Sequence, residues 1–292
     1  MRDQAEQLRE RLQREQKANP TRLVTVTSGK GGVGKSNFTL NFALGLLEQG
    51  HKTVIFDADL GFANLDVLMG NSPKKHLLHL LEPTTTIWDI IEKGPGGLEF
   101  IAGGTGFTQI TTFDDVKLDK IFAQLSMLNG HADTILFDTG AGITPESMRF
   151  ILSADEVLLV TTPEPTSITD AYALIKMVHS QNKQTRFRLV INRASSIQEG
   201  KQTADRLAMV AKRFLNMEVE TLGFVSDDGF VSKAVKLQKP FFLHYPQSQA
   251  ARDIRGLVPQ YIGRMDGGAS GMNQTVQGGL KGFLSKMRKL IR

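Results

Sequence analysis

Hydrophobic positions alternate between two spacings along residues 21–264. Short runs rich in Val, Ile, Leu and Thr predict buried strands, and longer stretches with apolar residues every three or four positions predict amphipathic helices. We expect strands at residues 23–27, 53–57, 98–102, 134–138, 157–161, 188–192 and 220–225. We expect helices at residues 35–49, 87–92, 115–128, 145–152, 167–180, 202–214 and 249–263.

This alternation of strands and helices favours one fold class. Parallel strands joined by helices form a doubly wound α/β sheet with helices on both faces. Ligands of such sheets bind beyond the carboxyl ends of the strands. We therefore predict one domain over residues 21–264, a mainly parallel sheet flanked by helices with its site at that edge.

Both ends of the chain leave this pattern. Residues 1–20 are almost wholly polar, with alternating charges, and predict an exposed arm. Residues 265–279 are rich in Gly, Ser, Asn and Gln, the composition of a flexible linker. Residues 280–292 have apolar residues at helical spacing with basic residues between them, which predicts an amphipathic helix.

A short basic amphipathic helix behind a flexible linker is typical of a reversible membrane anchor. Each basic residue near an anionic leaflet contributes about 1 kcal/mol, and two anchors on a dimer bind more strongly than one. The alternative is a helix packed back on the domain, and the two can be states of one switch. The residues expected to contact the membrane are Leu280, Phe283, Leu284, Lys286, Met287, Lys289 and Ile291.

The formal net charge of +5 belongs to the C-terminal segment. Five basic residues and no acidic residue follow Asp266, so the rest of the chain sums to zero. Binding to nucleic acid calls for a basic face on the domain itself. The neutral body therefore disfavours nucleic acid as a partner.

The chain contains no cysteine, which excludes disulfides, iron–sulfur clusters and thiolate zinc sites. It has no apolar run of the ~18 residues needed to span a bilayer, and its charged N-terminus does not resemble a secretory signal. We therefore expect a cytoplasmic protein that is reversibly peripheral at the inner face of the cell membrane.

Residues 29–36, Gly-Lys-Gly-Gly-Val-Gly-Lys-Ser, have the spacing of a phosphate-binding P-loop. The loop follows a predicted strand and opens a predicted helix, so backbone amides and the helix N-terminus would meet phosphate oxygens. Lys35 would reach the β- and γ-phosphates, and Ser36 would ligate Mg²⁺. The residues expected to hold the nucleotide in this segment are Gly29, Lys30, Gly31, Gly32, Val33, Gly34, Lys35, Ser36 and Asn37.

Three aspartates, Asp57, Asp59 and Asp138, stand where predicted strands end. An apolar strand that ends in Asp before a glycine-containing turn is the Walker B arrangement, whose carboxylate holds Mg²⁺ directly or through water. Of Asp57 and Asp59, one would serve the metal and the other would orient the attacking water. The alternative role for each aspartate is a turn former or helix cap.

The loop resembles the deviant Walker A motif of the MinD/ParA ATPase family, and the resemblance covers about residues 21–264. It implies a homodimer formed with ATP, in which Lys30 is catalytic because it reaches the partner's phosphates in trans. It also implies that Asp57 and Asp138 serve Mg²⁺ together with the P-loop serine, and that Asp59 is the catalytic, water-orienting residue.

The same resemblance places adenine near Asn192, at the end of a predicted strand, with Arg193 as a further candidate. The chain departs from the family at two points. Ser36 stands where the motif usually has Thr and supplies the same hydroxyl. Residues 225–228, Val-Ser-Asp-Asp, lack the proline-containing turn that the family often has, which leaves the remaining base contacts open.

The arm distinguishes branches of this family. Residues 3–9, Asp-Gln-Ala-Glu-Gln-Leu-Arg, resemble the arm of flagellar number regulators of the FlhG type, also known as YlxH or FleN. The resemblance implies that the signal-recognition-type GTPase FlhF is a partner that the arm stimulates, and that flagellar C-ring or regulatory proteins are further partners. The arm residues expected to bind FlhF are Asp3, Gln4, Leu8 and Arg9.

The interpretation that results is a slow, regulatory ATPase that binds ATP or ADP with Mg²⁺, dimerises with ATP, associates with an anionic membrane surface and controls flagellar number or placement. The alternatives are a division-site MinD, a ParA-like DNA-segregation ATPase, and a nucleotide-bound scaffold that hardly turns over. Asp59 argues against the scaffold, and the neutral body argues against DNA segregation.

Overall fold

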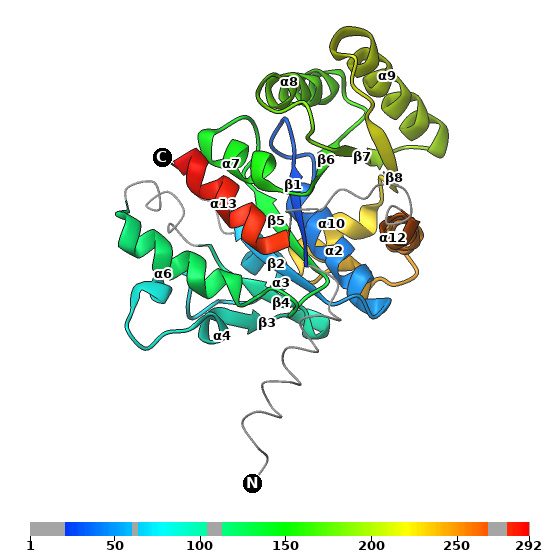
Figure 1. The fold of residues 1–292 in the computed structure, drawn as a ribbon. Helices are drawn as coiled ribbons and strands as arrows, with labels where there is room; N and C mark the ends of the chain where they lie inside the picture. Colours follow the sequence, from blue (N-terminus) through cyan, green and yellow to red (C-terminus); the bar gives the residue numbers. More distant parts are fainter. Residues whose placement is uncertain (1–20, 60–63, 104–112, 268–278, 292) are drawn as a thin grey trace.

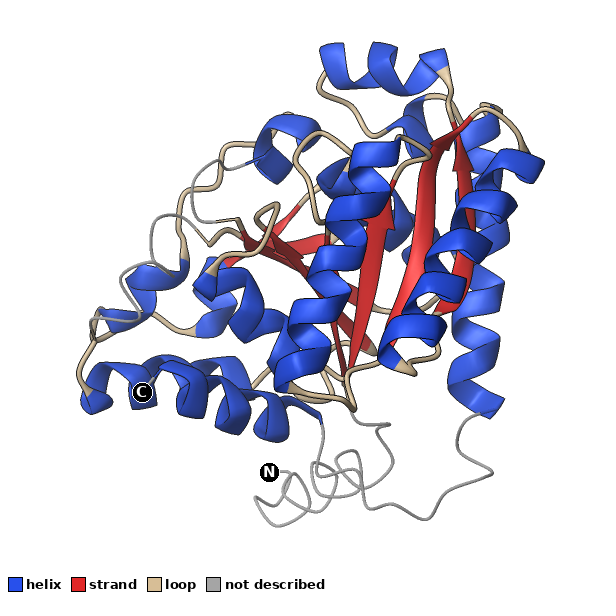
Figure 2. Ribbon diagram, turned by 90° about the horizontal axis from the view of Figure 1, so that it is seen from above, coloured by secondary structure: helices blue, strands red, loops and turns tan. Residues whose placement is uncertain are grey.

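The computed structural model of the chain describes residues 21–59, 64–103, 113–267 and 279–291. In this part of the chain, strands form an eight-stranded sheet in the order β3-β4-β2-β5-β1-β6-β7-β8. Neighbouring strands are parallel except for β3, which runs antiparallel to β4. Helices lie on both faces of the sheet (Figure 1, Figure 2). The predicted doubly wound, mainly parallel α/β class is confirmed.

The strands are β1 (Arg22–Thr27), β2 (Thr53–Ala58), β3 (Ile91–Lys93), β4 (Glu99–Ile101), β5 (Thr134–Thr139), β6 (Glu156–Thr161), β7 (Phe187–Ala194) and β8 (Glu220–Ser226). The helices are α2 (Lys35–Glu48), α3 (Asn64–Met69), α4 (Ile87–Ile90), α6 (Asp115–Ser126), α7 (Pro145–Ser153), α8 (Pro165–Gln181), α9 (Ile197–Leu215), α10 (Gly229–Lys236), α11 (Phe241–His244), α12 (Gln249–Gly267) and α13 (Gly279–Ile291). Two short 3-10 turns are η1 (Leu77–Leu81) and η2 (Pro95–Gly97).

The central strands are buried along their whole length. Every residue of β2, β5 and β6 is buried, because helices cover both faces of a parallel sheet. Such strands are apolar on both faces, which is why the sequence located them to within a residue or two.

Two helical layers enclose the sheet. On one face, α2, α11 and α12 pack through Phe42, Phe242 and Tyr261. On the other face, α6 and α13 form a cluster that includes Phe122 and Phe283. Helices α7, α8 and α9 form a further cluster beside it on that face. The sheet between the layers brings the carboxyl ends of β1, β2 and β5 to one edge.

The prediction of a helix over residues 87–92 is wrong at its end. Helix α4 stops at Ile90, and β3 begins at Ile91, which pairs with Ile101 of β4. The edge of the sheet offers hydrogen-bonding partners that the local sequence does not reveal, so tertiary pairing overrides helical periodicity. Helix α12 also continues to Gly267, beyond the predicted end at residue 263, even though it contains Pro259.

Within the described residues, no helix combines the length and the apolar character that crossing a bilayer requires.

Candidate nucleotide-binding site

The loop between β1 and α2 depends on glycine. Gly32 and Gly34 have φ angles of 80° and 86°, in the left-handed region that favours glycine. A Cβ at Gly29 would overlap the backbone of Asp170, and one at Gly34 would overlap the amide of Asn192. Any side chain at these two positions would push the loop away from its neighbours. The loop opens directly into α2, whose N-terminus favours an anion.

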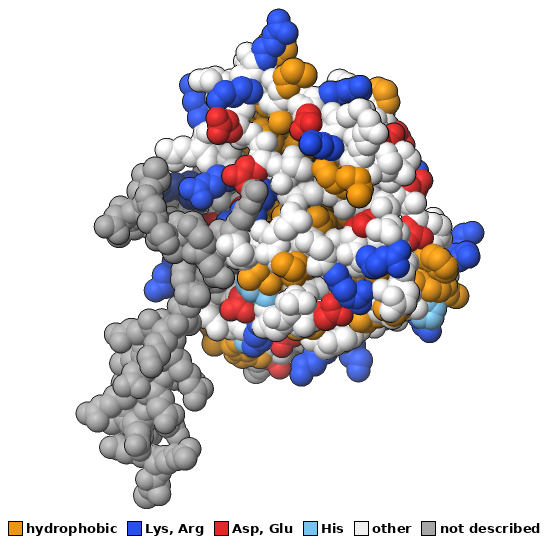
Figure 3. Space-filling view, turned by 90° about the vertical axis from the view of Figure 1, so that its right-hand side faces the viewer, with side chains coloured by type: hydrophobic (Ala, Val, Ile, Leu, Met, Phe, Trp, Pro, Cys, Tyr) orange, Lys and Arg blue, Asp and Glu red, His pale blue; other side chains and the backbone are white. Residues whose placement is uncertain are grey.

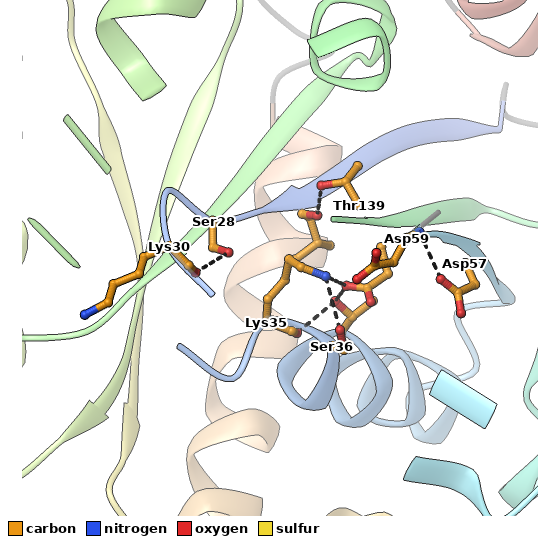
Figure 4. A network of polar contacts seen from close by, with 10 residues as sticks. Ser28, Lys30, Lys35, Ser36, Asp57, Asp59 and Thr139 are labelled. Atoms are coloured by element: carbon orange, nitrogen blue, oxygen red, sulfur yellow. Dashed lines mark hydrogen bonds and ion pairs between the residues drawn. The ribbon is translucent and has the colours of Figure 1, made fainter. Parts of the chain in front are cut away.

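The side chain of Lys35 lies inside this loop and is only 6% exposed. Its Nζ is 2.9 Å from Oδ1 of Asp138, at the end of β5, and 3.1 Å from Oγ of Ser36. Figure 4 shows this ammonium group directed into the cluster of polar side chains at the end of the sheet. Lys35 is therefore held by an aspartate at the position where a nucleotide phosphate would compete for it.

A second α2 residue, Thr39, also contacts Asp138. Its hydroxyl donates to Oδ1 at 2.8 Å, so Asp138 accepts from both Thr39 and Lys35. Thr39 was not among the predicted site residues. Its spacing of four residues from Lys35, which places both on one face of α2, was the available signal.

Asp57 lies at the end of β2, directly beside Asp138 in the register of the two strands. It is 5% exposed, and its Oδ1 accepts a hydrogen bond of 3.0 Å from the amide of Asp59. Burial, to which the negative charge of Asp138 adds, raises the pKa of Asp57 to about 8. Two neighbouring buried carboxylates disfavour each other's ionisation, and a cation between them would relieve this.

Asp59 lies next to the loop that follows β5. A Cβ placed on Gly140 would lie 3.4 Å from Oδ1 of Asp59. Figure 4 shows Asp57, Asp59, Lys35 and Ser36 close together, contributed by β2, the segment after it and the start of α2. The structure therefore brings the aspartates at the ends of β2 and β5 together with the P-loop.

These residues fit a nucleotide with Mg²⁺. The buried Oδ2 of Asp138 has no hydrogen-bond partner among the described residues, and a metal ion or its bound water would satisfy it. In the described part of the chain, no group of three or more His, Cys, Asp or Glu could hold a metal ion. Mg²⁺ commonly uses one or two carboxylates completed by substrate phosphates. Ser36, Asp57 and Asp138 are the residues that would hold it.

Lys30 points away from this cluster. Its Nζ donates to Oγ1 of Thr166 at 2.9 Å and lies 3.5 Å from Oε2 of Glu164. Both partners stand at the start of α8, and the lysine side chain is 40% exposed. Figure 4 shows Lys30 and Lys35 extending in opposite directions from the same loop. In this chain Lys30 therefore cannot serve the phosphates bound by its own loop without reorienting.

The two candidate base contacts differ in placement. Asn192, near the end of β7, donates from Nδ2 to the carbonyl of Val33 at 2.8 Å and so contacts the P-loop itself. Arg193 has a φ angle of 57°, and its Nε lies 3.9 Å from Oδ1 of Asp227. Asn37 is occupied within α2, because both its carbonyl and its side-chain oxygen accept from Asn41 Nδ2.

The remaining predicted sites lie at the ends of the chain. Helix α13 packs on the domain: the rings of Phe283 and Phe137 stack at 4.7 Å with 5° between their planes. Lys286 and Lys289 are exposed, and Ile291 is half-buried. The predicted membrane-contacting residues that are buried are Leu280, Phe283, Leu284 and Met287.

Polar contacts also hold α13. Arg288 lies 2.6 Å from Asp119 and 3.5 Å from Asp115, both on α6. Nε of Arg149, on α7, donates to the carbonyl of Leu290 at 3.0 Å. The structure thus contains the packed-back state of the helix. The predicted partner-binding residues Asp3, Gln4, Leu8 and Arg9 lie outside the described residues.

Comparison with known proteins identifies the family that this chain matches. A family model described as "ParA: NUBPL iron-transfer P-loop NTPase" matches residues 19–262. The match shows the P-loop NTPase family, and iron transfer is said by that description of its own protein.

Two curated relatives match most of the chain. Antiactivator FleN of Pseudomonas aeruginosa is 38% identical over 240 residues, which cover 82% of this chain and 86% of FleN. Flagellum site-determining protein YlxH of Helicobacter pylori is 34% identical over 273 residues, which cover 93% of this chain and 91% of YlxH.

A solved structure of the septum site-determining protein MinD from Pyrococcus horikoshii, complexed with Mg-ADP, has the same fold. Its TM-score is 0.67 at 25% sequence identity, and the match covers 86% of this chain and 100% of that chain.

Proposed function

Because the chain belongs to the ParA family of P-loop NTPases, we propose that it is an ATP-driven dimerising switch that regulates flagellar number at the membrane. The chain is an ATPase of this family. The proposal adds the dimer, the membrane and the flagellar process. Each of these is supported by a different part of the chain.

Nucleotide binding exchanges one partner of Lys35 for another. The ammonium group that now pairs with Asp138 at 2.9 Å would turn to phosphate oxygens, and Asp138 would then be free to serve Mg²⁺ with Ser36 and Asp57. Bound Mg²⁺ supplies charge neutralisation of the phosphates. Asp59 would orient the attacking water, since phosphoryl transfer needs mainly positioning and electrostatic stabilisation.

The opposite directions of the two P-loop lysines carry the proposal of a dimer. Thr166 and Glu164 hold Lys30 outward, where it can meet the phosphates of a second copy. A cation supplied in trans then completes each site, as an arginine finger does in other P-loop enzymes. ATP hydrolysis would be slow until two chains meet.

Light scattering of the purified protein tests this dimer. We expect a dimeric mass with ATP and a monomeric mass without it. Lys30→Ala should remain monomeric with ATP, and Asp59→Ala should hold the dimer because it binds ATP without hydrolysing it. Lys176→Ala, which removes an exposed lysine from α8, is the control and should behave as the unmodified protein. A mass independent of ATP would refute the proposal.

Membrane association is proposed through release of α13. The apolar face that would enter a lipid surface is buried on the domain, and Lys286 and Lys289 remain outside it. When α13 leaves the domain, the same face becomes available to an anionic leaflet. Deleting residues 279–292 should abolish ATP-dependent flotation with anionic vesicles; unchanged flotation would contradict an anchor in α13. The protein would then be cytoplasmic and reversibly peripheral at the inner face of the membrane.

The flagellar process is proposed from the relatives. The names of FleN and YlxH refer to antiactivation and to flagellum site determination, and we extend flagellar regulation to this chain. We further propose that residues 1–20 stimulate the GTPase FlhF, and that C-ring or regulatory proteins bind as well. A GTPase assay of FlhF with a peptide of residues 1–20 should show stimulation, and a Gln4→Ala peptide should lose it.

Division-site selection is the second candidate function. The septum site-determining protein MinD of Helicobacter pylori is 33% identical, but over 168 residues that cover 56% of this chain. Absence of FlhF stimulation by the residue 1–20 peptide would favour this candidate.

A further inference from the structure

Helix α10, α11 and the turn between them expose an unusual amount of apolar surface. Phe230 is 43% exposed, Leu237 52% and Leu243 45%. Ala234 is the one fully buried residue of α10, whereas a helix that covers a sheet normally buries a whole stripe of residues. The rings of Phe230 and Tyr245 lie 4.8 Å apart and join the two helices. Exposed apolar side chains are therefore concentrated between residues 230 and 243.

Lysines alternate with these apolar side chains. Lys233, Lys236 and Lys239 are all exposed, and none of them pairs with a carboxylate among the described residues. Nζ of Lys233 lies 4.8 Å from the centre of the Phe230 ring. The residues of this α10–α11 surface are Phe230, Lys233, Val235, Lys236, Leu237, Lys239 and Leu243.

No acidic residue lies between Asp228 and Asp253 to offset these lysines. The two flanking carboxylates are engaged by amide donors. Asp228 accepts from the amides of Phe230 at 2.9 Å and Ala250 at 3.1 Å. Asp253 accepts from the amide of Ser226 at 2.8 Å and from Gln249 Nε2 at 2.7 Å. The α10–α11 surface is therefore both apolar and positively charged, which is notable on a body without net charge.

We propose that the α10–α11 surface is a second membrane-contacting site, which binds anionic lipid headgroups. Lysines near an anionic leaflet are attracted to it, and Phe and Leu side chains enter the boundary between headgroups and acyl chains. A fluid leaflet accepts interleaved lysines and apolar side chains without matched pockets. Nucleic acid would meet the lysines and leave Leu237 and Leu243 in water. The inference rests on the proposed membrane association.

The position of this surface complements that of α13. Buried residues of α10 and α11 belong to the cluster that α2 and α12 form on one face of the sheet, whereas α13 packs on the other face. In Figure 1, α10 lies beside α2 near the middle of the view, and α13 lies to the left. Figure 3 shows the side that includes α12, where lysine and arginine side chains lie among separate hydrophobic ones. Helix α12 follows α11, and the chain from Gly267 to Gly279 can span at most about 40 Å. A released α13 and the α10–α11 surface would give the domain two points of contact, and thus a set orientation on the membrane.

A single introduced cysteine can report this contact, because the chain has none of its own. Leu237→Cys would carry an environment-sensitive fluorophore, and Met209→Cys, at a 61% exposed position on α9, is the matched control. Vesicles of phosphatidylcholine with phosphatidylglycerol are added with ATP. We expect a blue shift and increased emission at position 237, no change at position 209, and little response at either with phosphatidylcholine alone.

Charge reversal supplies an independent measurement on the full chain. Lys236→Glu with Lys239→Glu should weaken vesicle binding at least about tenfold, because two attractive charges become repulsive. Lys201→Glu with Arg206→Glu on α9 makes the same change in net charge and should weaken binding by less than about threefold. Circular dichroism and nucleotide binding should be unchanged in both.

The outcomes separate the two proposals. If the unmodified chain binds no vesicles in any nucleotide state, membrane association itself is overturned, and this surface with it. A second outcome is that vesicles bind, the fluorophore at position 237 shows no change, and Lys236→Glu with Lys239→Glu weakens binding no more than the α9 control. This outcome overturns the proposal for the α10–α11 surface and leaves membrane association intact. In that case α13 would be the membrane site, and a partner protein would be the better assignment for these lysines.

Discussion

At the scale of single residues, the two P-loop lysines have different partners. Lys35 is buried and paired with Asp138, whereas Lys30 is half-exposed and held by α8. The spacing of residues 29–36 predicted a nucleotide and the resemblance supplied the role in trans. The direction of each ammonium group came from tertiary contacts with β5 and α8, which local sequence cannot specify.

Thr166 should therefore position Lys30 for the second chain. Thr166→Ala removes a hydrogen bond of 2.9 Å, and such a bond contributes about 0.5–1.5 kcal/mol. We expect ATP-dependent dimerisation to weaken by roughly two- to tenfold, with ATP binding by the monomer unchanged. Thr169→Ala, which alters a hydroxyl bonded within α8, is the control. Analytical ultracentrifugation with ATP gives the comparison, and equal dissociation constants for both variants would contradict a positioning role.

Asp155 should make stability depend on pH. Its carboxylate accepts from the amide of Leu23 at 2.9 Å, and burial raises its pKa above the usual range. Below about pH 4 the group is neutral in both states; as pH rises through the raised pKa, the folded protein must ionise a buried carboxyl that is already charged when unfolded. The free energy of unfolding then falls with pH.

Asp155→Asn keeps an acceptor for the Leu23 amide but has no carboxyl to ionise. The variant should therefore lack the part of the decline in the free energy of unfolding with pH that Asp155 causes. Its stability relative to the unmodified protein should rise from pH 4 toward neutrality. Urea unfolding across that range measures the difference, with Asp205→Asn on α9 as the control. Parallel pH profiles for the unmodified protein and Asp155→Asn would show that the charged form is not disfavoured.

At the scale of elements, the sequence did not decide against which surface α13 packs. Its periodicity and basic residues predicted an amphipathic helix. The sequence did not decide whether a membrane or the domain itself covers the apolar face of that helix. The structure has the helix on the domain, where Phe283 stacks on Phe137. Phe137 immediately precedes Asp138, so the docking site of α13 and the nucleotide site share one strand.

Weakening the docked state should increase membrane binding without ATP. Asp119→Asn removes the nearer of the two carboxylates that pair with Arg288 on α6 and leaves the sequence of α13 intact. An exposed ion pair contributes about 0.2–1 kcal/mol, so the undocked population should rise by roughly 1.4- to fivefold. Hydrogen exchange of residues 279–291 and vesicle flotation without ATP should both increase. The control is Asp205→Asn, and unchanged exchange in Asp119→Asn would show that this pair does not hold the helix.

The short elements mark the other limit of the sequence. Helices α3, α10 and α11 and strand β3 were not predicted, and each has eight residues or fewer. Periodicity needs several turns to be recognised, so elements of this length depend on what they pack against. The α10–α11 surface, which carries the proposal of a second membrane-contacting site, arises from two of them.

At the scale of the whole molecule, each site is expected to need two chains. We propose that Asp59 acts in the chain that binds the nucleotide, and that Lys30 acts on the nucleotide of the other chain. A mixture of Lys30→Ala and Asp59→Ala should therefore form heterodimers with one complete site, although neither variant hydrolyses ATP alone. Random pairing across a two-fold interface would give roughly a quarter of the unmodified rate. Because Lys30→Ala does not pair with itself and Asp59→Ala does, we expect the mixture to reach at most about this value. A mixture no more active than its components would refute action in trans. Lys35→Ala mixed with Lys30→Ala is a second test: the heterodimer again has one complete site, and its other site lacks the lysine that binds phosphate.

The sequence by itself determined the features that depend on neighbours along the chain: the strands, the long helices, the glycine-rich loop and the aspartates at strand ends. The tertiary structure decided which surfaces meet. It placed Asp57 beside Asp138, turned Lys30 outward and covered α13 with the domain. The physical reason is that burial of apolar surface is non-directional. An apolar stripe predicts that a helix will leave water, but a protein core and a lipid leaflet satisfy that stripe equally, and only the packing of the folded chain shows which one holds it.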